Sequence, residues 1–162
     1  MDMLLTLLNE NSRYSNKQLA VMLGITEAEV EEKIKALEEN GIIRGYKTVI
    51  NWEKVDKYDA VTALIEIRVS PKRETGFDEI ASEIVRFSEV ESVYLMSGGY
   101  DLAVIITAHT FKDIALFVSQ KLAPLPSVLS TATHFVLTRY KDNGITMSDE
   151  SADERRFDLY ND

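Results

Sequence analysis

Residues 15–41 have the sequence SNKQLAVMLGITEAEVEEKIKALEENG. They contain two capping boxes, in which a serine or threonine is followed three residues later by glutamine or glutamate: Ser15 with Gln18, and Thr26 with Glu29. Each pair satisfies backbone amides that have no partner at the start of a helix. Gly24 and Gly41 supply the left-handed residue with which many helices end. We therefore predict a short helix over 16–23 and a longer one over 26–40, joined by a tight turn.

The apolar residues of these two helices recur at helical spacing, on sides that would face each other. They are Leu19, Ala20 and Leu23 in the first helix, and Val30, Ile34 and Leu37 in the second. This is a helix-turn-helix pattern, which is common in DNA-binding proteins but also occurs as a helix pair in a bundle. A further helix before it is predicted from Met3, Leu4, Leu7 and Leu8. Residues 42–50 are strand-like and predict a wing or a linking strand, with Arg44 and Lys47 pointing outward.

From about residue 60 the apolar period changes from helical to alternating. The pattern predicts strands over 61–69, 93–97, 100–107 and 128–137, with Gly98-Gly99 as the turn between the second and the third. Helical stripes follow the first and the third strand. The order βαββαβ is the ferredoxin-like unit, so the predicted fold class is α+β. Its sheet has helices on one face only, and we expect dimerisation to cover the other, because Leu64 and Leu95 would otherwise be exposed.

The formal net charge of −9 lowers the expectation of nucleic-acid binding, because phosphate contacts need lysine and arginine. The charge is uneven, however: residues 1–50 carry 6 basic and 8 acidic groups, 51–142 carry 10 and 13, and 143–162 carry 2 and 6. The predicted elements and the charge distribution together suggest a division of the chain. We expect a helix-turn-helix domain (1–50), a linker (51–60), a βαββαβ domain (61–142) and an acidic C-terminal tail (143–162).

The composition excludes several classes of protein and site. The chain has no cysteine, and its two histidines, His109 and His134, are too few for a histidine metal cluster. The purely apolar run Leu102–Ile106 is far shorter than the ~20 residues of a membrane span. No basic n-region begins the chain, and no Walker loop, G-x-S-x-G motif or metal-ligand spacing occurs. We expect a soluble cytoplasmic protein that is not an enzyme and that holds no metal or cofactor.

Four pieces of sequence carry a resemblance to a known family: LAVMLGIT (19–26), LEENGIIRGY (37–46), SGGYDL (97–102) and STATHFVL (130–137). In this order and spacing they resemble the Lrp/AsnC (leucine-responsive, feast/famine) transcriptional regulators, over about residues 3–140. The resemblance implies an N-terminal (winged) helix-turn-helix that binds double-stranded DNA, and a C-terminal ferredoxin-like domain of the RAM type. It also implies homodimers that assemble further, to tetramers or octamers, and an amino-acid effector bound where the C-terminal domains meet.

Some features depart from the family pattern. The chain begins almost inside its first helix, and Lys33 stands where the family commonly has arginine. The longer helix of the pair carries four glutamates: Glu27, Glu29, Glu31 and Glu32. These departures leave open a degenerate module whose helix-turn-helix serves only assembly or protein contacts. A second alternative is an enzyme similar to the sirohaem decarboxylases of this architecture, with His109 and His134 pointing into one cavity from predicted strands.

The apolar side of the longer helix faces the core, so the candidate DNA-binding residues are sought on its opposite side. Opposite its apolar positions lie Ala28, Glu32, Lys35 and Glu39. Glu31 or Glu32 could accept from cytosine in the major groove, although a solvated charged face explains each of them singly. Phosphate contacts would fall to Arg13, Lys17, Lys33, Lys35, Arg44 and Lys47. The candidate surface adds Thr26, Glu27 and Ala28 at the helix start.

Gly98 and Gly99 lie between two predicted strands and are explained first as a turn that needs positive φ. In the functional interpretation their amides stay open to an anion, while Asp101 supplies a carboxylate for an ammonium. These complement the two charges of a free amino acid, and the family resemblance places the effector at this loop. The candidate effector-binding residues are Met96, Ser97, Gly98, Gly99, Tyr100 and Asp101, with Thr131 and Thr133 from the last strand. Interface packing by Tyr100 and a structural cap by Asp101 remain alternatives.

Overall fold

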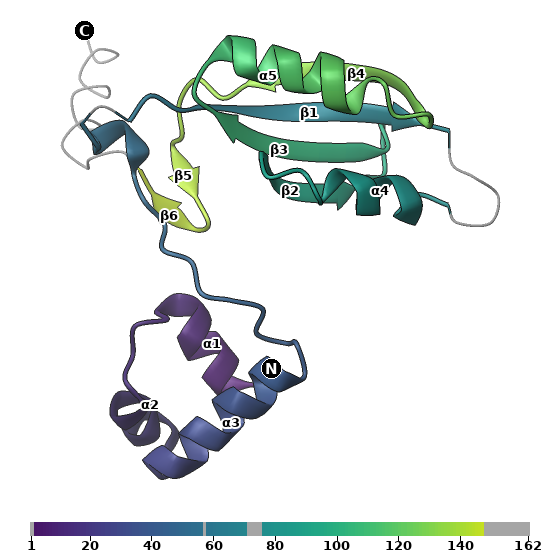
Figure 1. The fold of residues 1–162 in the computed structure, drawn as a ribbon. Coiled ribbons are helices and arrows are strands. Elements are labelled where there is room, and N and C mark those ends of the chain that lie inside the picture. The colour runs from purple at the N-terminus through teal and green to yellow at the C-terminus, as the bar shows by residue number, and fades with distance from the viewer. Residues whose placement is uncertain (1, 57, 71–75, 148–162) are drawn as a thin grey trace, which may run out of the picture. The chain divides into compact units, whose positions relative to one another are not determined.

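The computed structural model describes residues 2–56, 58–70 and 76–147. The chain divides into two compact units, Met1–Val49 and Ile50–Asp162 (Figure 1). The first unit holds the helices α1 (Met3–Glu10), α2 (Asn16–Leu23) and α3 (Glu27–Glu39). The second holds a four-stranded sheet with its helices and a short hairpin. Each unit is built around a hydrophobic core of its own.

Both predicted capping boxes form, and they fix the starts of α2 and α3. The Ser15 hydroxyl accepts from the Gln18 amide at 3.2 Å, while the Gln18 side-chain oxygen accepts from the Ser15 amide at 2.9 Å. Thr26 and Glu29 make the same pair of hydrogen bonds, at 3.2 and 2.8 Å. Gly24 ends α2 in the left-handed region, with a φ of 68°. The helix-turn-helix predicted from the sequence is confirmed.

The core of the first unit is small. Its buried side chains come from each of the three helices: Leu4 in α1, Leu19 and Ala20 in α2, and Val30 in α3. Partly buried neighbours surround them: Leu7, Leu8, Tyr14, Leu23, Ile25, Ile34 and Leu37. The Asp2 carboxylate caps α1 by accepting from the Leu4 amide at 3.0 Å. Full burial of one aliphatic side chain contributes only about 1.5–3 kcal/mol, so a core of this size gives the unit modest stability.

Residues 42–50 do not form the predicted strand in this chain. A strand needs a neighbouring strand to complete its hydrogen bonds, and within the described residues this mostly exposed segment has none (Figure 1). The amides of Ile42 and Ile43 instead donate to the Leu37 carbonyl oxygen, at 2.9 and 3.1 Å, and so close the C-terminal end of α3. The prediction of a strand was therefore wrong for the single chain.

The second unit has the predicted order βαββαβ. After the 3-10 turn η1 (Trp52–Lys54), its elements are β1 (Val61–Val69), α4 (Asp78–Ile84), β2 (Val90–Leu95), β3 (Leu102–Ala108), α5 (Phe111–Phe117) with the π-helical turn η2 (Val118–Leu122), and β4 (Val128–Phe135). The strands form an antiparallel sheet in the order β2-β3-β1-β4. β2 ends earlier and β3 begins later than predicted, because the whole segment 96–101 connects them.

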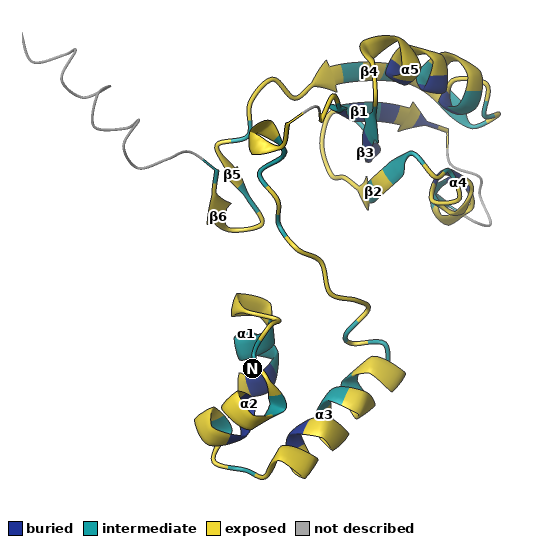
Figure 2. Ribbon diagram, turned by 60° about the vertical axis from the view of Figure 1, so that its left-hand side comes forward, coloured by how far each residue is buried: buried dark blue, intermediate teal, exposed yellow. Residues whose placement is uncertain are grey.

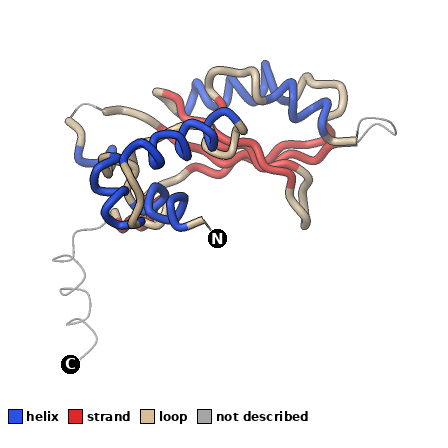
Figure 3. The backbone as a smooth tube through the Cα atoms, turned by 90° about the horizontal axis from the view of Figure 1, so that it is seen from below, coloured by secondary structure: helices blue, strands red, loops and turns tan. Residues whose placement is uncertain are grey.

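Helices α4 and α5 cover one face of the sheet (Figure 3). Alternate residues of the central strand β1, among them Ile65 and Ile67, pack in one buried cluster with Ile84 of α4 and Ile114 of α5. This alternation is the period of two read from the sequence. The same alternation leaves the other residues of β1 on the uncovered face.

The uncovered face carries Leu64, as predicted, but it does not carry Leu95. Leu95 pairs with Leu102, which in turn pairs with Ile67 of the buried cluster. Leu95 therefore lies on the helix-covered side, 60% exposed because β2 is an edge strand. Its neighbour Tyr94, 52% exposed, takes the uncovered side instead. The register of β2 on β3 decides which of two successive side chains faces the helices, since side chains alternate between the faces of a sheet.

A hairpin follows the sheet, formed by β5 (Lys141–Asp142) and β6 (Ile145–Thr146). Asn143 and Gly144 connect these strands with φ values of 45° and 83°, the combination of a tight hairpin turn. The Asn51 side-chain amide donates to the Met147 carbonyl oxygen at 2.8 Å. The expected start of the acidic tail at residue 143 thus falls inside the hairpin, and the remainder of that tail, 148–162, lies outside the described residues.

Candidate DNA-binding surface and effector site

Every candidate DNA-binding residue of the first unit is exposed. They lie in the turn before α2, on α2, at the start and along the length of α3, and in the segment after it: Arg13, Lys17, Thr26, Glu27, Ala28, Glu31, Glu32, Lys33, Lys35, Arg44 and Lys47. Figure 2 shows α3 exposed along its outer side and buried toward α1 and α2. Because Val30 is fully buried and Leu37 partly so, the outward face of α3 is the one predicted.

The glutamates of α3 differ in what they contact. Hydrogen bonds from Thr26 hold the pKa of Glu29 below its ordinary value, and the nearby charge of Lys33 adds to this effect. By contrast, Glu27, Glu31 and Glu32 have no hydrogen bond or ion pair with the part of the chain that the structure describes. The cap accounts for Glu29, and Glu27 stands in the first turn, where a negative charge stabilises the helix start. Glu31 and Glu32 have no internal contact among the described residues.

The C-terminal end of α3 has the left-handed glycine predicted from the sequence, together with side-chain contacts that the sequence did not indicate. Gly41 has a φ of 68°, and the Arg44 guanidinium lies over it, 3.0 Å from where a Cβ would stand. A cation at this place is favoured by the partial negative charge of the helix end. The Tyr46 hydroxyl donates to the Glu38 carboxylate at 2.9 Å, and burial together with this bond raises the pKa of Tyr46. Arg44 therefore has a structural contact besides any contact to phosphate.

Segment 96–101, between β2 and β3, is held in shape by Asp101. The Met96 amide donates to the Asp101 carbonyl oxygen at 2.8 Å, and the Asp101 amide donates to Ile67 of β1 at 3.0 Å. One carboxylate oxygen of Asp101 accepts from the Val69 amide at 2.9 Å. The structural role considered for Asp101 is therefore real, and it uses one of the two carboxylate oxygens.

The two glycines of this segment keep their amides open. Neither Gly98, at a φ of 157°, nor Gly99 donates an amide hydrogen bond to a residue that the structure describes. The Gly99 carbonyl oxygen accepts from Nε of Arg68 at 2.9 Å. Sequence reasoning missed Arg68, although its outward position near the end of β1 was visible in the alternation. Its guanidinium brings a positive charge to the segment.

The structure does not bring Thr131 and Thr133 to this segment within one chain. They pair with Ile67 and Ile65 of β1 and so point toward the helix-covered side of the sheet. β4 is also the edge strand farthest from β2. The remaining candidates, Met96 to Asp101, are contiguous in the chain and lie together.

Two family models match this chain. Residues 3–44 match a winged helix-turn-helix DNA-binding model, and residues 62–146 match the Lrp/AsnC ligand-binding domain, more than half of the 162 residues. The chain belongs to the Lrp/AsnC family. It is a DNA-binding transcriptional regulator, and its helix-turn-helix lies within the residues that match the DNA-binding model.

Curated Lrp/AsnC relatives align over nearly the whole chain. The HTH-type transcriptional regulator YugG of Bacillus subtilis is 49% identical over 152 residues, covering 94% of this chain and 92% of the relative. The HTH-type transcriptional regulator LrpA of Pyrococcus abyssi is 32% identical, covering 85% and 94%. The crystal structure of the leucine response regulatory protein of Mycobacterium tuberculosis matches with a TM-score of 0.72 at 21% identity, covering 88% and 97%. The fold is thus the family fold in both units.

The histidines of this Lrp/AsnC protein do not share a cavity. His109 follows the end of β3 rather than lying on a strand. His134 lies on β4, with its Nε2 3.4 Å from the carboxylate of Glu66 on the uncovered face. The expectation that both point into one cavity from strands was wrong. Among the described residues, no three or more His, Cys, Asp or Glu side chains are grouped to hold a metal ion, and no helix could span a membrane.

Proposed function

We propose that this protein regulates genes of amino-acid metabolism by binding operators as a dimer-based assembly, and that a free amino acid bound at segment 96–101 controls this binding. The observation that carries the proposal is the chemistry of the segment. The segment has two open glycine amides, the Arg68 guanidinium bound to the Gly99 carbonyl oxygen, and the Asp101 carboxylate bound to the Val69 amide. A free amino acid presents the complementary pair of charges, a carboxylate and an ammonium.

Each half of such a ligand has groups to receive it. The carboxylate would accept from the amides of Gly98 and Gly99 and from the Arg68 nitrogens that Gly99 does not use. The ammonium would donate to the carboxylate oxygen of Asp101 that the Val69 amide leaves free. Met96, Ser97 and Tyr100 complete the proposed site. Thr131 and Thr133 could reach it only from a second subunit, because in one chain they point to the other side of the sheet.

Related proteins support the ligand class and the target class. A feast or famine regulatory protein of M. tuberculosis and a transcriptional regulator of Neisseria meningitidis have solved structures in complex with L-methionine. They match this chain at TM-scores of 0.68 and identities of 22% and 23%. A relative from Rhizobium radiobacter, 28% identical over 88% of this chain, is named a proline dehydrogenase transcriptional activator. Both facts concern those proteins, and they make an amino acid the first class of ligand to test here.

We further propose that assembly makes the DNA binding effective. The uncovered sheet face offers a surface for a second copy, and homodimers would join into tetramers or octamers. The candidate phosphate contacts are few and dispersed: Arg13, Lys17, Lys33, Lys35, Arg44 and Lys47. Linked subunits multiply them by raising the effective concentration of each contact. The effector would act by shifting the population of assemblies, and with it the spacing of the DNA-reading helices.

The test is capture of sheared genomic DNA by the purified protein, followed by sequencing, with and without a pool of the twenty amino acids. Enrichment of a few loci is expected without the pool, and a changed set or strength of enrichment with it. The assembly state is measured on the same preparation by sedimentation. A folded oligomer that enriches no locus under either condition would overturn the proposal in favour of an assembly module.

A further inference from the structure

A cavity of about 520 Å³ lies at the opposite end of β3 from segment 96–101. β3 begins after Asp101 and ends before His109, and its length at about 3.4 Å per residue separates the two places by roughly 20 Å. The walls come from four parts of the second unit: the segment before β1, the turn between α4 and β2, the end of β3, and α5 with η2. The volume is within the range of small-molecule sites, about 300–1,000 Å³.

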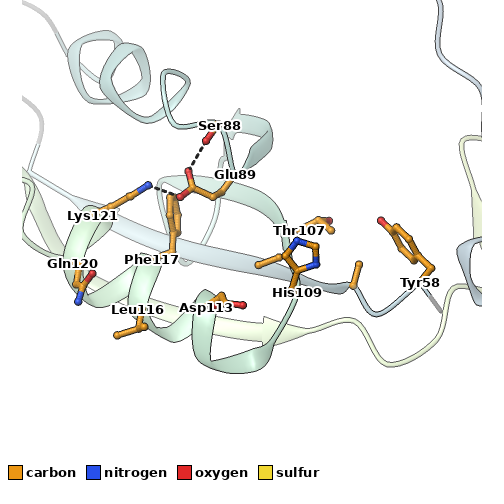
Figure 4. Close-up of a pocket in the computed structure, with 12 residues that line it drawn as sticks. Tyr58, Ser88, Glu89, Thr107, His109, Asp113, Leu116, Phe117, Gln120 and Lys121 are labelled. Carbon is orange, nitrogen blue, oxygen red and sulfur yellow. Dashed lines mark hydrogen bonds and ion pairs between the residues drawn. The ribbon is translucent and has the colours of Figure 1, made fainter.

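An ion pair stands in the wall of this cavity. The Lys121 ammonium contacts the Glu89 carboxylate, which also accepts from the Ser88 hydroxyl at 3.2 Å (Figure 4). The bond from Lys121 is the main reason why the pKa of Glu89 is lowered. The Lys121 nitrogen lies 5.5 Å from the ring centres of Phe87 and Phe117. Both charged side chains remain accessible, 41% and 31% exposed, so a solute can reach the pair.

The backbone that presents Lys121 is unusual. Residues Val118–Leu122 form a π-helical turn, closed by the Ala123 amide on the Val118 carbonyl oxygen at 2.8 Å. Such single turns are rare, and they are frequent at functional sites. This turn is independent of the cavity and of the ion pair as an observation.

We infer that the cavity binds a free amino acid with an apolar side chain, at a site separate from segment 96–101. A ligand of one charge could pair with Lys121 or with Glu89 but would leave the other without its partner. A zwitterion satisfies both: its carboxylate accepts from Lys121 while its ammonium donates to Glu89, and one ion pair becomes two. Leu116 and Phe117 line the same cavity and supply the apolar wall for the side chain.

The cavity also reaches the segment that leads to the DNA-binding unit. Tyr58 lines it, with its hydroxyl turned toward Thr107 and His109 (Figure 4). On its other side the Tyr58 ring stacks on Trp52, with ring centres 4.1 Å apart and planes inclined by 18°. A ligand that contacts Tyr58 would therefore also act on Trp52, which lies close after the end of the first unit in the chain. The site gives a second amino acid a route to the linker that does not pass through segment 96–101.

The structure contains a reporter for this event, because Trp52 is the single tryptophan of the chain. The experiment titrates the full-length protein with L-leucine, L-methionine and L-phenylalanine and follows tryptophan fluorescence. The variants are Lys121→Gln, Glu89→Gln and Asp101→Asn, with Lys112→Gln on the exposed side of α5 as the matched control. Circular dichroism and thermal unfolding confirm that each variant is folded. Leucinamide and N-acetyl-leucine, each with one charge, serve as probes of the ligand class.

We expect a saturable fluorescence change with at least one amino acid, weakened about tenfold or more by Lys121→Gln and by Glu89→Gln. Lys112→Gln should leave it unaltered, and both singly charged probes should bind about tenfold more weakly. A change lost in Asp101→Asn but kept in Lys121→Gln would overturn the second site and assign the signal to segment 96–101. No saturable change, or equal binding of the singly charged probes, would overturn the inference itself while leaving the proposed operator binding intact.

Discussion

On α3 of the first unit, some polar side chains cap the helix, and others face solvent without a partner among the described residues. In the second unit, the candidate residue Asp101 combines a structural contact with a proposed binding role. Thr26 and Glu29 are occupied by a cap, whereas Glu32 next to them on α3 contacts nothing that the structure describes. Asp101 instead accepts from the Val69 amide at the end of β1 with one oxygen, and its other oxygen is the one proposed to bind a ligand. In the first unit, therefore, a substitution should change either stability or binding. At Asp101 in the second unit, only a conservative substitution should change binding without changing stability.

Reversing two charges on α3 should have the largest effect. The double change Lys33→Glu and Lys35→Glu is expected to weaken DNA binding by about a hundredfold or more, because each lost contact between a cation and a phosphate costs about 1.5–3 kcal/mol. The exposed pair Lys35–Glu39, 3.9 Å apart, contributes little to stability, so the oligomer should persist. Fluorescence anisotropy with an enriched locus measures the affinity. The matched control, Lys112→Glu with Lys141→Glu, changes the net charge equally on the second unit, and a similar loss there would refute the surface.

Neighbouring glutamates of α3 should differ in base reading. We expect Glu32→Gln to alter the preferred base at one operator position by about 1–3 kcal/mol, since glutamate accepts from cytosine whereas glutamine pairs with adenine. Glu31→Gln removes the same charge one residue away from the outward face, and it should raise affinity for all sequences alike. Selection from a random DNA library with each variant measures the preference. An identical motif for both variants would assign Glu32 to the solvated surface.

At segment 96–101, one substitution of Asp101 should separate its structural contact from its proposed role in amino-acid binding. Asp101→Asn keeps an oxygen for the Val69 amide but loses the charge for an ammonium, so amino-acid affinity should fall about tenfold with the free energy of unfolding unchanged. Asp101→Ala should lower both, the free energy of unfolding by about 1 kcal/mol. Calorimetric titration and denaturant unfolding give the two quantities. Unaltered amino-acid binding by Asp101→Asn would remove the segment from the effector site.

Loss of a cap in the first unit should cost less. Thr26→Ala removes the hydroxyl that accepts from the Glu29 amide and should lower the stability of this unit by about 1 kcal/mol. The second unit should unfold as before, because no described contact of Thr26 reaches it. Unfolding followed by residue-resolved NMR distinguishes the units. Thr110→Ala, in the equivalent capping box of α5, is the matched variant and should show the reverse pattern.

The smallest effect expected is a dependence on pH. The pKa of Glu29 is lower in the folded protein than its ordinary value of 4.5, because Thr26 donates to the charged form. The stability from this bond is therefore fully present above pH 4.5 and is lost as the pH falls through the lowered value. Acid unfolding of the first unit should be less steep in Thr26→Ala than in the unmodified protein. Equal slopes in the two proteins would mean that Glu29 does not couple the cap to pH.

The fold was predictable wherever the signal was local. The two capping boxes gave the helix starts within a residue, and the alternation over 61–69 gave β1 with its buried side. Ends set by tertiary contacts were not predictable: β2 was misplaced because its register depends on pairing with β3, and Leu95 changed faces with it. Residues 42–50 looked like a strand but lacked the neighbour that a strand needs.

The candidate site was predictable in part for the same reason. Segment 96–101 is contiguous, so its glycines and Asp101 were found together. Arg68 was missed because only the pairing of β1 with β3 brings it to Gly99, 31 positions later in the chain. The cavity around Lys121 and Glu89 was missed as well, since four separate segments contribute its walls. Sequence spacing finds sites made from one segment and does not find sites made by long-range packing.

The small core around Leu4, Leu19, Ala20 and Val30 has a consequence for how the molecule opens. Local unfolding is governed by the apolar area that each cooperative segment buries, so the first unit should open more often than the sheet. Its amide protons should exchange with deuterium sooner than those of β1 and β3, and a protease should cut it before it cuts the second unit. Bound DNA would slow both processes by mass action, since it binds the closed form alone. The half-life of the intact helix-turn-helix under protease digestion would then report how much of the protein is bound to an operator.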